Sequence, residues 1–542
     1  MQFFSKSIIC LVIFILSATF LFGADNLATA AVPKWGITKR GTTLKNSDYY
    51  WEMEAGYGLD KNCDGRIDIP NTASYFATDS FNIVLGLTDS FLEKNRLPVS
   101  EANKFILSLE ATSNGKTYVA LSKGRAMLLK NVRVGTYSGI LTLRYQTKGF
   151  EIPITINPKK YVIAAIGDSY ISGEGAPEKI YKRGDYSLWA DGGINSDAIL
   201  NHARAHRSSK SWASQLALFL EEEDPHSSII FVFLPASGAW TSMGILEPYG
   251  GTDRTLGLQL PAQLDELSAI TGGKQIDYLF FTTGGNDLGF VPVITLSLLL
   301  SDKSKTGIPD SRYKKKFDQI IDCAKTGEWG NAPLATLFGY KKAKPRLGFV
   351  GLEKALTSMD NQIRKNLNAK NIFFVGYPLP VNAGEDTMLD LFSGLKISSY
   401  EATRVINEIM IPLDKLSSDI SKKLGWNYIS LLKAYDYSKH GYNASLPYSP
   451  SDYMDYIESL SLPLRWNEFK TIALDKEISW FRSASNSVVI QGSHMDGRRP
   501  NKLNTKGTVH PNELGYQAIM HQVLRNLKLP TDFPSDFQNE YK

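Results

Sequence analysis

The feature that most constrains the fold is a change of hydrophobic period at Pro158. From about residue 75 to 157, apolar residues alternate with other residues, as in the run 150–156. Successive side chains of a strand point to opposite faces, so this alternation predicts strands with one buried face. Lys148-Gly149 separates the last two runs and is predicted to form a hairpin turn. Because we identify no helical segment among these runs, we expect a small all-β sandwich.

After Pro158 the pattern becomes strand then helix. Short apolar runs predict strands at 161–166, 229–234, 276–281 and 372–375. Stretches of helical period predict helices near 209–222, 259–271, 351–368, 399–424 and 512–526. Alternating strands and helices imply an α/β domain, in which helices cover both faces of a parallel sheet. Reactive groups in such sheets lie at the carboxyl ends of the strands.

The first thirty residues have the order of a secretory signal peptide. Lys6 precedes fifteen mostly apolar residues, and Ala28-Thr29-Ala30 follows a short polar stretch. We expect export with cleavage after Ala30. A membrane anchor is the alternative, but fifteen residues are short for a hydrocarbon layer of roughly 30 Å. No later stretch of the sequence is long and apolar enough to predict a transmembrane span.

These patterns predict three parts: a signal peptide over 1–30, a β-sandwich over 31–158 and an α/β domain over 159–542. The α/β domain has long stretches beyond a minimal sheet near 291–350 and 435–490. The net charge of +5 is spread over 542 residues without a basic block interleaved with aromatics, which argues against a nucleic-acid partner. Cleavage would leave only Cys63 and Cys323, which do not make a disulfide framework.

Four short motifs follow predicted strands or precede the last predicted helix. Ser169 closes the first strand in Gly-Asp-Ser, where its hydroxyl would be exposed at a sharp turn; a helix cap is the alternative. Gly238 follows the second strand, where it lets a backbone N–H approach a substrate or simply makes a tight turn. Asn286 follows the third strand and can donate to an oxyanion. His510 precedes the last helix and could be a base or a structural histidine.

Together these motifs resemble the SGNH (GDSL-like) hydrolase family, in the same order along the chain. The resemblance implies that Ser169 is the nucleophile and that His510, in His-Pro-Asn, is the general base. It also implies an oxyanion hole made by the Ser169 N–H, the Gly238 N–H and the Asn286 amide. The expected chemistry is acyl transfer through a Ser169 acyl-enzyme, which requires no metal or organic cofactor.

Further residues are similar to a subgroup of secreted bacterial lipases and esterases in that family. They are Ser172-Gly173-Glu174-Gly175, Trp189 and His206-Arg207-Ser208. A cysteine often precedes the His-Arg-Ser in this subgroup, and Ala205 stands there in this chain. The chain also departs at the acid of the triad, because Gly507 occupies the position three residues before His510. Asp496 is the nearest upstream carboxylate, and a main-chain carbonyl is the alternative partner for the imidazole.

We therefore expect a secreted serine esterase or lipase acting on an ester of a lipid or an acylated glycan. A carbohydrate acetyl-esterase is the alternative within the same chemistry. A protein of another class would use the sandwich to bind a surface glycan while the hydrolase domain is inert. The presence of Ser169, Asn286 and His510 together favours the enzyme.

A loop near the N-terminus resembles the first nine positions of an EF-hand calcium loop, within residues 60–71. Its predicted calcium ligands are the side chains of Asp60, Asn62, Asp64 and Asp68 and the carbonyl of Arg66. Asn71 stands where a bidentate glutamate is expected. A structural calcium site and a ligand-free turn rich in Asp and Asn both fit this pattern.

The stretch 435–481 is rich in aromatic residues. It holds ten aromatics in 47 residues, 21% against 11% for the whole chain. Such a segment can form a lid or an acyl-binding wall over the serine. The alternative, which we favour, is that this segment forms additional core and covering loops.

Overall fold

The computed structural model describes most of both predicted domains. Within the residues it describes, no helix combines the length and hydropathy needed to cross a membrane. The signal sequence, Trp189 and most of the aromatic stretch lie outside this set. The described residues are 48–54, 58–60, 66–68, 75–76, 80–176, 204–250, 259–290, 293, 310–331, 346–379, 381, 387–388, 396–433, 481, 507 and 509–527.

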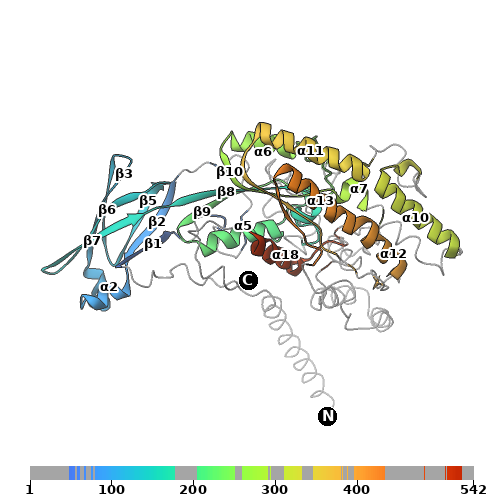
Figure 1. The fold of residues 1–542 in the computed structure, drawn as a ribbon. Helices are drawn as coiled ribbons and strands as arrows, with labels where there is room; N and C mark the ends of the chain where they lie inside the picture. Colours follow the sequence, from blue (N-terminus) through green and yellow to red (C-terminus); the bar gives the residue numbers. More distant parts are fainter. Residues whose placement is uncertain are drawn as a thin grey trace, which may run out of the picture.

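Two antiparallel sheets pack face to face in the N-terminal part, as the period-two pattern predicts (Figure 1). The first sheet has the order β1-β2-β5, with β1 (Tyr49–Met53), β2 (Ser80–Leu87) and β5 (Ala126–Arg133). The second has the order β4-β3-β6-β7, with β3 (Ile106–Ser113), β4 (Lys116–Lys123), β6 (Tyr137–Tyr145) and β7 (Lys148–Ile156). Their inward faces share one core, in which Ile83, Leu107 and Leu141 are fully buried.

Two local predictions for this part are wrong. First, a helix α2 (Asp89–Lys94) and a 3₁₀-helix η2 (Val99–Lys104) lie between β2 and β3. The helix forms because Thr88 caps it and Phe91 and Leu92 are buried. Second, Lys148 and Gly149 are not the hairpin turn: Tyr145 pairs with Lys148, so the turn is residues 146–147. Gln146 there adopts the left-handed φ of 54° that a tight hairpin turn requires.

The second part contains the predicted parallel sheet, in the order β14-β11-β10-β8-β9. Both faces of the inner strand β8 are buried, because Ala164 and Ala165 belong to two different core clusters. Strand β14 and the helix α10 (Asp310–Thr326) were not predicted from the sequence. The sheet comprises β8 (Lys159–Gly167), β9 (Ser227–Phe233), β10 (Gln275–Thr282), β11 (Asn368–Val375) and β14 (Asn427–Ile429).

Helices cover both faces of this sheet (Figure 1). On one face lie α6 (Gln263–Thr271), α11 (Gly348–Asn366) and α13 (Ile411–Leu424). On the other lie α5 (Trp212–Glu223) and α18 (Glu513–Asn526), which contact each other. The predicted helices agree with these within a few residues, except that 399–424 is interrupted. It consists of α12 (Ser399–Val405), a π-helical turn η6 (Ile406–Met410) and α13.

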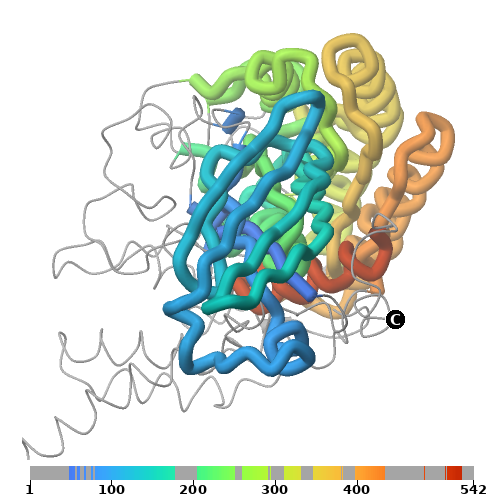
Figure 2. Tube along the Cα trace, turned by 90° about the vertical axis from the view of Figure 1, so that its left-hand side faces the viewer, coloured from blue at the N-terminus to red at the C-terminus, as the bar shows by residue number. Residues whose placement is uncertain are grey.

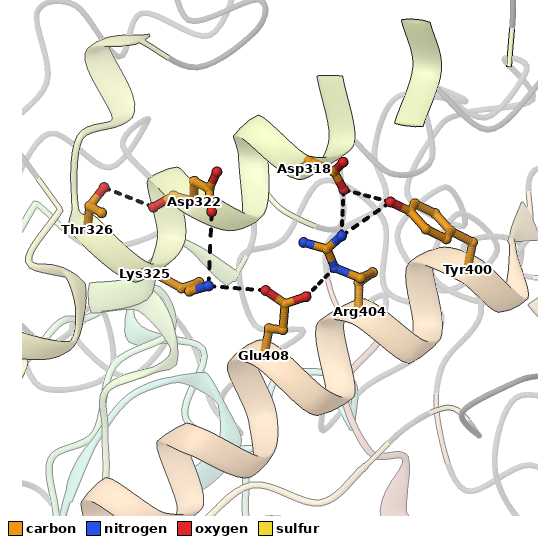
Figure 3. Close-up of polar contacts among 7 residues, drawn as sticks. All are labelled: Asp318, Asp322, Lys325, Thr326, Tyr400, Arg404 and Glu408. Carbon is orange, nitrogen blue, oxygen red and sulfur yellow. Dashed lines mark hydrogen bonds and ion pairs between the residues drawn. The ribbon is translucent and has the colours of Figure 1, made fainter. Parts of the chain in front are cut away.

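Helix α10 lies within the stretch 291–350 and belongs to the core. Phe317 and Ile320 are fully buried in it. Charged side chains also join α10 to α12 and the π-helical turn, as Figure 3 shows. Asp318 accepts from Arg404 at 2.8 Å, and Lys325 donates to Glu408 at 3.1 Å. The described part of this insertion is therefore additional packed structure.

The sandwich and the parallel sheet are directly connected, because only two residues separate the end of β7 from the start of β8. Figure 2 views the molecule from the sandwich end, with the parallel sheet and its helices behind. The Met53 N–H donates to the Pro225 carbonyl at 2.9 Å. The Trp51 ring stacks on His226 with centroids 4.1 Å apart. These contacts attach β1 to the turn that precedes β9.

Candidate active site

Ser169 lies at the sharp turn where β8 ends. Asp168 caps the four-residue helix α3 (Ser169–Ser172), and its carboxylate accepts from the Tyr170 N–H at 3.0 Å. Gly167 precedes this turn with a φ of 129°, and a Cβ there would lie 2.2 Å from the Thr282 carbonyl oxygen. A glycine is therefore required for β8 to approach β10 so closely and then turn. This turn places the Ser169 hydroxyl at the carboxyl edge of the sheet, where the residue is 7% exposed.

His510 faces Ser169 from the loop before α18. Its Nε2 lies 2.7 Å from the Ser169 Oγ, although 341 residues separate them. Asn512 caps α18 by accepting from the Gly515 N–H at 2.9 Å, which sets where the helix begins. The histidine is 9% exposed, so little solvent competes for this contact.

A strained backbone position supports the histidine loop. Val509 has a φ of 64°, which is costly for a β-branched residue. Its carbonyl accepts from the Tyr170 hydroxyl at 2.8 Å, and the Tyr170 and His510 rings lie 4.9 Å apart. The residue next to the nucleophile therefore holds the loop that carries the histidine. The sequence motifs did not predict that Tyr170 would hold the histidine loop.

Gly238 and Asn286 lie on neighbouring turns at the same edge. Gly238 follows β9 with a φ of 76°, which favours glycine. Asn286 is in the short helix α7 (Gly285–Leu288) after β10, and its Nδ2 donates to the Ala239 carbonyl at 2.9 Å. An amide nitrogen carries two hydrogens, so one bond does not exhaust its donor capacity. The Asn286 side chain is thereby attached to the turn that contains Gly238.

A buried tyrosine joins the nucleophile turn to the Asn286 turn. Tyr377, which follows β11, donates its hydroxyl hydrogen to Asp168 and accepts from the Gly285 N–H at 3.0 Å. Burial raises the pKa of Asp168 to about 7, although the bonds from Tyr377 and Tyr170 lower it. No motif contains Tyr377, but its place directly after a strand of the parallel sheet is a signal that could have identified it.

A second buried carboxyl group belongs to Asp287, the residue after Asn286. Asp287 accepts from the Thr241 N–H at 2.9 Å and from the Thr241 hydroxyl at 3.0 Å. Burial raises the pKa of Asp287 to about 6, while the bonds from Thr241 oppose that rise. Thr241 comes three residues after Gly238, so this contact again links the two turns.

Several residues singled out in the sequence lie outside the described part of the chain or away from Ser169 in the sequence. Asp496, Cys63, Asn62 and Asp64 lie outside the described residues. The described ends of the predicted calcium loop are joined by a bond from the Asp68 N–H to the Leu59 carbonyl at 2.6 Å. The Arg66 side chain pairs with Glu513 at 3.3 Å. Cys323 is buried with a free thiol.

Comparison with protein-family models gave no match, and no curated protein matches the sequence. Solved structures of similar fold include an extracellular lipase from Streptomyces rimosus, at 15% identity and a TM-score of 0.36, covering 68% of this chain and 100% of that one. Phospholipase A1 from Streptomyces albidoflavus is 19% identical with a TM-score of 0.34, covering 68% of this chain and 99% of that one. A putative GDSL-like lipase from Parabacteroides merdae is 13% identical with a TM-score of 0.26, covering 68% and 97%.

The parallel sheet is flanked by helices, and three of the four motifs follow successive strands at one edge. The fourth lies before the last helix and contacts the first. The larger part of this chain has an SGNH-like hydrolase fold.

Proposed function

We propose that this protein is a secreted serine ester hydrolase in which Ser169 is the nucleophile and His510 the base. The observation that carries the proposal is the 2.7 Å contact between the His510 Nε2 and the Ser169 Oγ in a nearly buried site. A nucleophile and a base within hydrogen-bond reach are the first requirement of acyl transfer. Asn286 and Gly238 on the adjoining turns favour the same chemistry, because acyl transfer also requires oxyanion donors.

The reaction follows in two halves. His510 takes the hydroxyl proton of Ser169 through Nε2, and the Oγ attacks the ester carbonyl carbon. The tetrahedral oxyanion accepts from the Ser169 N–H, the Gly238 N–H and the Asn286 amide. His510 then gives its proton to the departing alcohol, which leaves an acyl-Ser169. In the second half His510 activates a water that hydrolyses this ester. Serine, histidine, water and substrate account for every proton and electron pair in these steps.

The function is tested with p-nitrophenyl esters from short to long acyl chains, using the mature protein and Ser169→Ala as the matched control. Turnover by the wild type and none by the variant is expected. Activity confined to acetylated sugars would instead identify a carbohydrate acetyl-esterase. If neither class of ester is hydrolysed and both proteins bind a glycan equally, the protein is a binding module and the proposal is wrong.

We propose that the imidazole is oriented by a main-chain carbonyl rather than by Asp496. Gly507, at the position of the usual acid, has a φ of 87°, and its carbonyl accepts from the main-chain N–H of His510 at 3.2 Å. This tight turn suits glycine and offers backbone rather than a carboxylate. Asp496→Asn should therefore leave kcat/KM within a few-fold of wild type. A loss on the order of 10⁴, as when a triad acid is neutralised, would identify Asp496 as the third member.

We propose that the loop from Asp60 to Asp68 binds calcium and stabilises the connection between β1 and β2 of the sandwich. The bond between Asp68 and Leu59 closes the loop, and the Arg66 side chain is directed to Glu513, which is compatible with its carbonyl acting as a ligand. A chelator should then lower the melting temperature and leave kcat unchanged. The measurement is a thermal scan with calcium and with chelator, with Asp60→Asn as a variant that should respond less. Superimposable curves would reject the site.

A further inference from the structure

Glu174 is a buried carboxylate beside the proposed site that the reaction steps above do not use. It follows α3 and is 2% exposed. Its Oε2 lies 2.5 Å from the Nδ1 of His206, which is 1% exposed. Removing a charged group from water is costly, and a pair of apolar side chains would fill the same space at less cost. An ionisable pair at this depth therefore points to a role beyond packing.

Glu174 contacts three segments of the site. Its N–H donates to the Ser169 carbonyl at 3.2 Å, which ties it to the nucleophile turn. Its carbonyl accepts from the Tyr516 hydroxyl at 2.7 Å, in the helix that follows the His510 loop. Its carboxylate accepts from the hydroxyl of Ser237, the residue before Gly238. One residue thus connects the segments of the nucleophile, the base and the oxyanion donors.

The carboxylate of Glu174 stays ionised despite its burial. Burial raises its pKa, but the positive charge and hydrogen bond of His206, the charge of His510 and the Ser237 bond outweigh that effect and lower it to about 2. The other two buried carboxyls of the site differ: burial raises the pKa of Asp168 to about 7 and of Asp287 to about 6. Asp168 accepts a hydrogen bond from Tyr377, and Asp287 accepts hydrogen bonds from Thr241. Glu174 instead keeps a negative charge that interacts with the charge of His510.

Interaction between two titrating groups is mutual. If the positive charge of His510 favours ionised Glu174, the Glu174 carboxylate favours the protonated imidazole to the same extent. His510 must become protonated when it takes the Ser169 proton. Glu513, three residues after His510, also carries a negative charge, but it pairs with two permanent cations, Lys210 at 3.4 Å and Arg66 at 3.3 Å, whereas Glu174 pairs with the single imidazole of His206.

We propose that Glu174 is a positioning residue for the Ser169–His510 pair, whose buried carboxylate supports the charge that His510 gains and holds the Ser237–Gly238 turn in place. It supplies from beside α3 the negative charge that Gly507 cannot supply. This inference rests on the proposed function, because it assigns Glu174 a part in that same reaction.

Glu174→Gln tests the charge while it keeps the shape of the side chain. Without the carboxylate the imidazolium is less favoured, so the acidic limb of the pH–rate profile should move to lower pH by about one unit. The value of kcat should fall about tenfold with KM nearly unchanged. A residue that only packs would lower the melting temperature without moving the limb.

His206→Asn is the matched variant. An asparagine amide can occupy the place of Nδ1–H, and asparagine tolerates the positive φ of 52° at this position. Because the carboxylate remains, the limb should not move to lower pH. Equal downward shifts in the two variants, or no shift in Glu174→Gln, would overturn the proposal. If Glu174→Gln does not fold, Glu174→Asp takes its place, and a limb at lower pH in that variant would overturn it as well.

The same profiles are measured with a fluorophosphonate, which labels an activated serine without ester turnover. A wild type that reacts with this probe but hydrolyses no ester would contradict the proposed function, while the shift in Glu174→Gln would still decide the inference. If the wild type hydrolyses esters but Glu174→Gln does not shift the acidic limb in either assay, the inference is contradicted and the proposed function stands.

Discussion

His510→Ala is expected to abolish measurable ester hydrolysis, with a loss on the order of 10⁶ in kcat, as when one member of a serine–base unit is removed. The physical reason is that the Ser169 hydroxyl, 2.7 Å from Nε2, has no other described base at hydrogen-bond distance. A neutral hydroxyl is a poor nucleophile at neutral pH. The measurement is kcat and KM on the best p-nitrophenyl ester, with Ser169→Ala measured alongside. The double variant should lose no more than either single variant, because the two residues act as a unit.

His521→Ala is the matched control for this prediction. His521 is a half-buried histidine in α18, the helix that follows the His510 loop, and burial and the charge of Arg525 lower its pKa. Its loss should leave kcat close to wild type. A His510→Ala enzyme that keeps a substantial share of its activity would show that another group activates Ser169.

Asn286→Ala is expected to lower kcat by about 10² to 10³ with little change in KM, the range for removal of one oxyanion donor. The side chain is held by Ala239 on the turn of Gly238, and its neighbour Asp287 is held by Thr241. It is therefore fixed before substrate arrives, and it can stabilise charge that develops only in the transition state. The measurement is steady-state kinetics with one short-chain ester.

Asn371→Ala is the control for loss of a side-chain amide that donates to a main-chain carbonyl. Its half-buried side chain donates through Nδ2 to the Asp277 carbonyl at 2.9 Å, in the amino-terminal half of β11. It should affect stability and spare kcat. If Asn286→Ala raised KM and left kcat unchanged, Asn286 would bind substrate without stabilising the oxyanion.

The two-part architecture and the positions of the four motifs could be predicted from the sequence. Alternation by two predicted the sandwich, and alternating strands and helices predicted the parallel sheet, because side-chain periodicity reports directly which faces are buried. Gly167, Gly238 and Gly284 have a positive φ at the turns of three motifs, so these glycines mark the turns in the sequence as well as in the structure. The turn at residues 146–147 and the helix α2 were missed because non-glycine residues and local burial form them.

How the motifs meet depends on long-range packing, which the sequence patterns do not report. Residues 169 and 510 are 341 positions apart, and no local pattern predicts a 2.7 Å contact across that separation. The same holds for the residues that support them: Tyr377 reaches Asp168 and Gly285, and Glu174 reaches His206, through long-range packing. Buried polar groups must find partners wherever the fold brings them together. The sequence names the groups that can react, while the packing of distant segments sets their distances, their charges and their support.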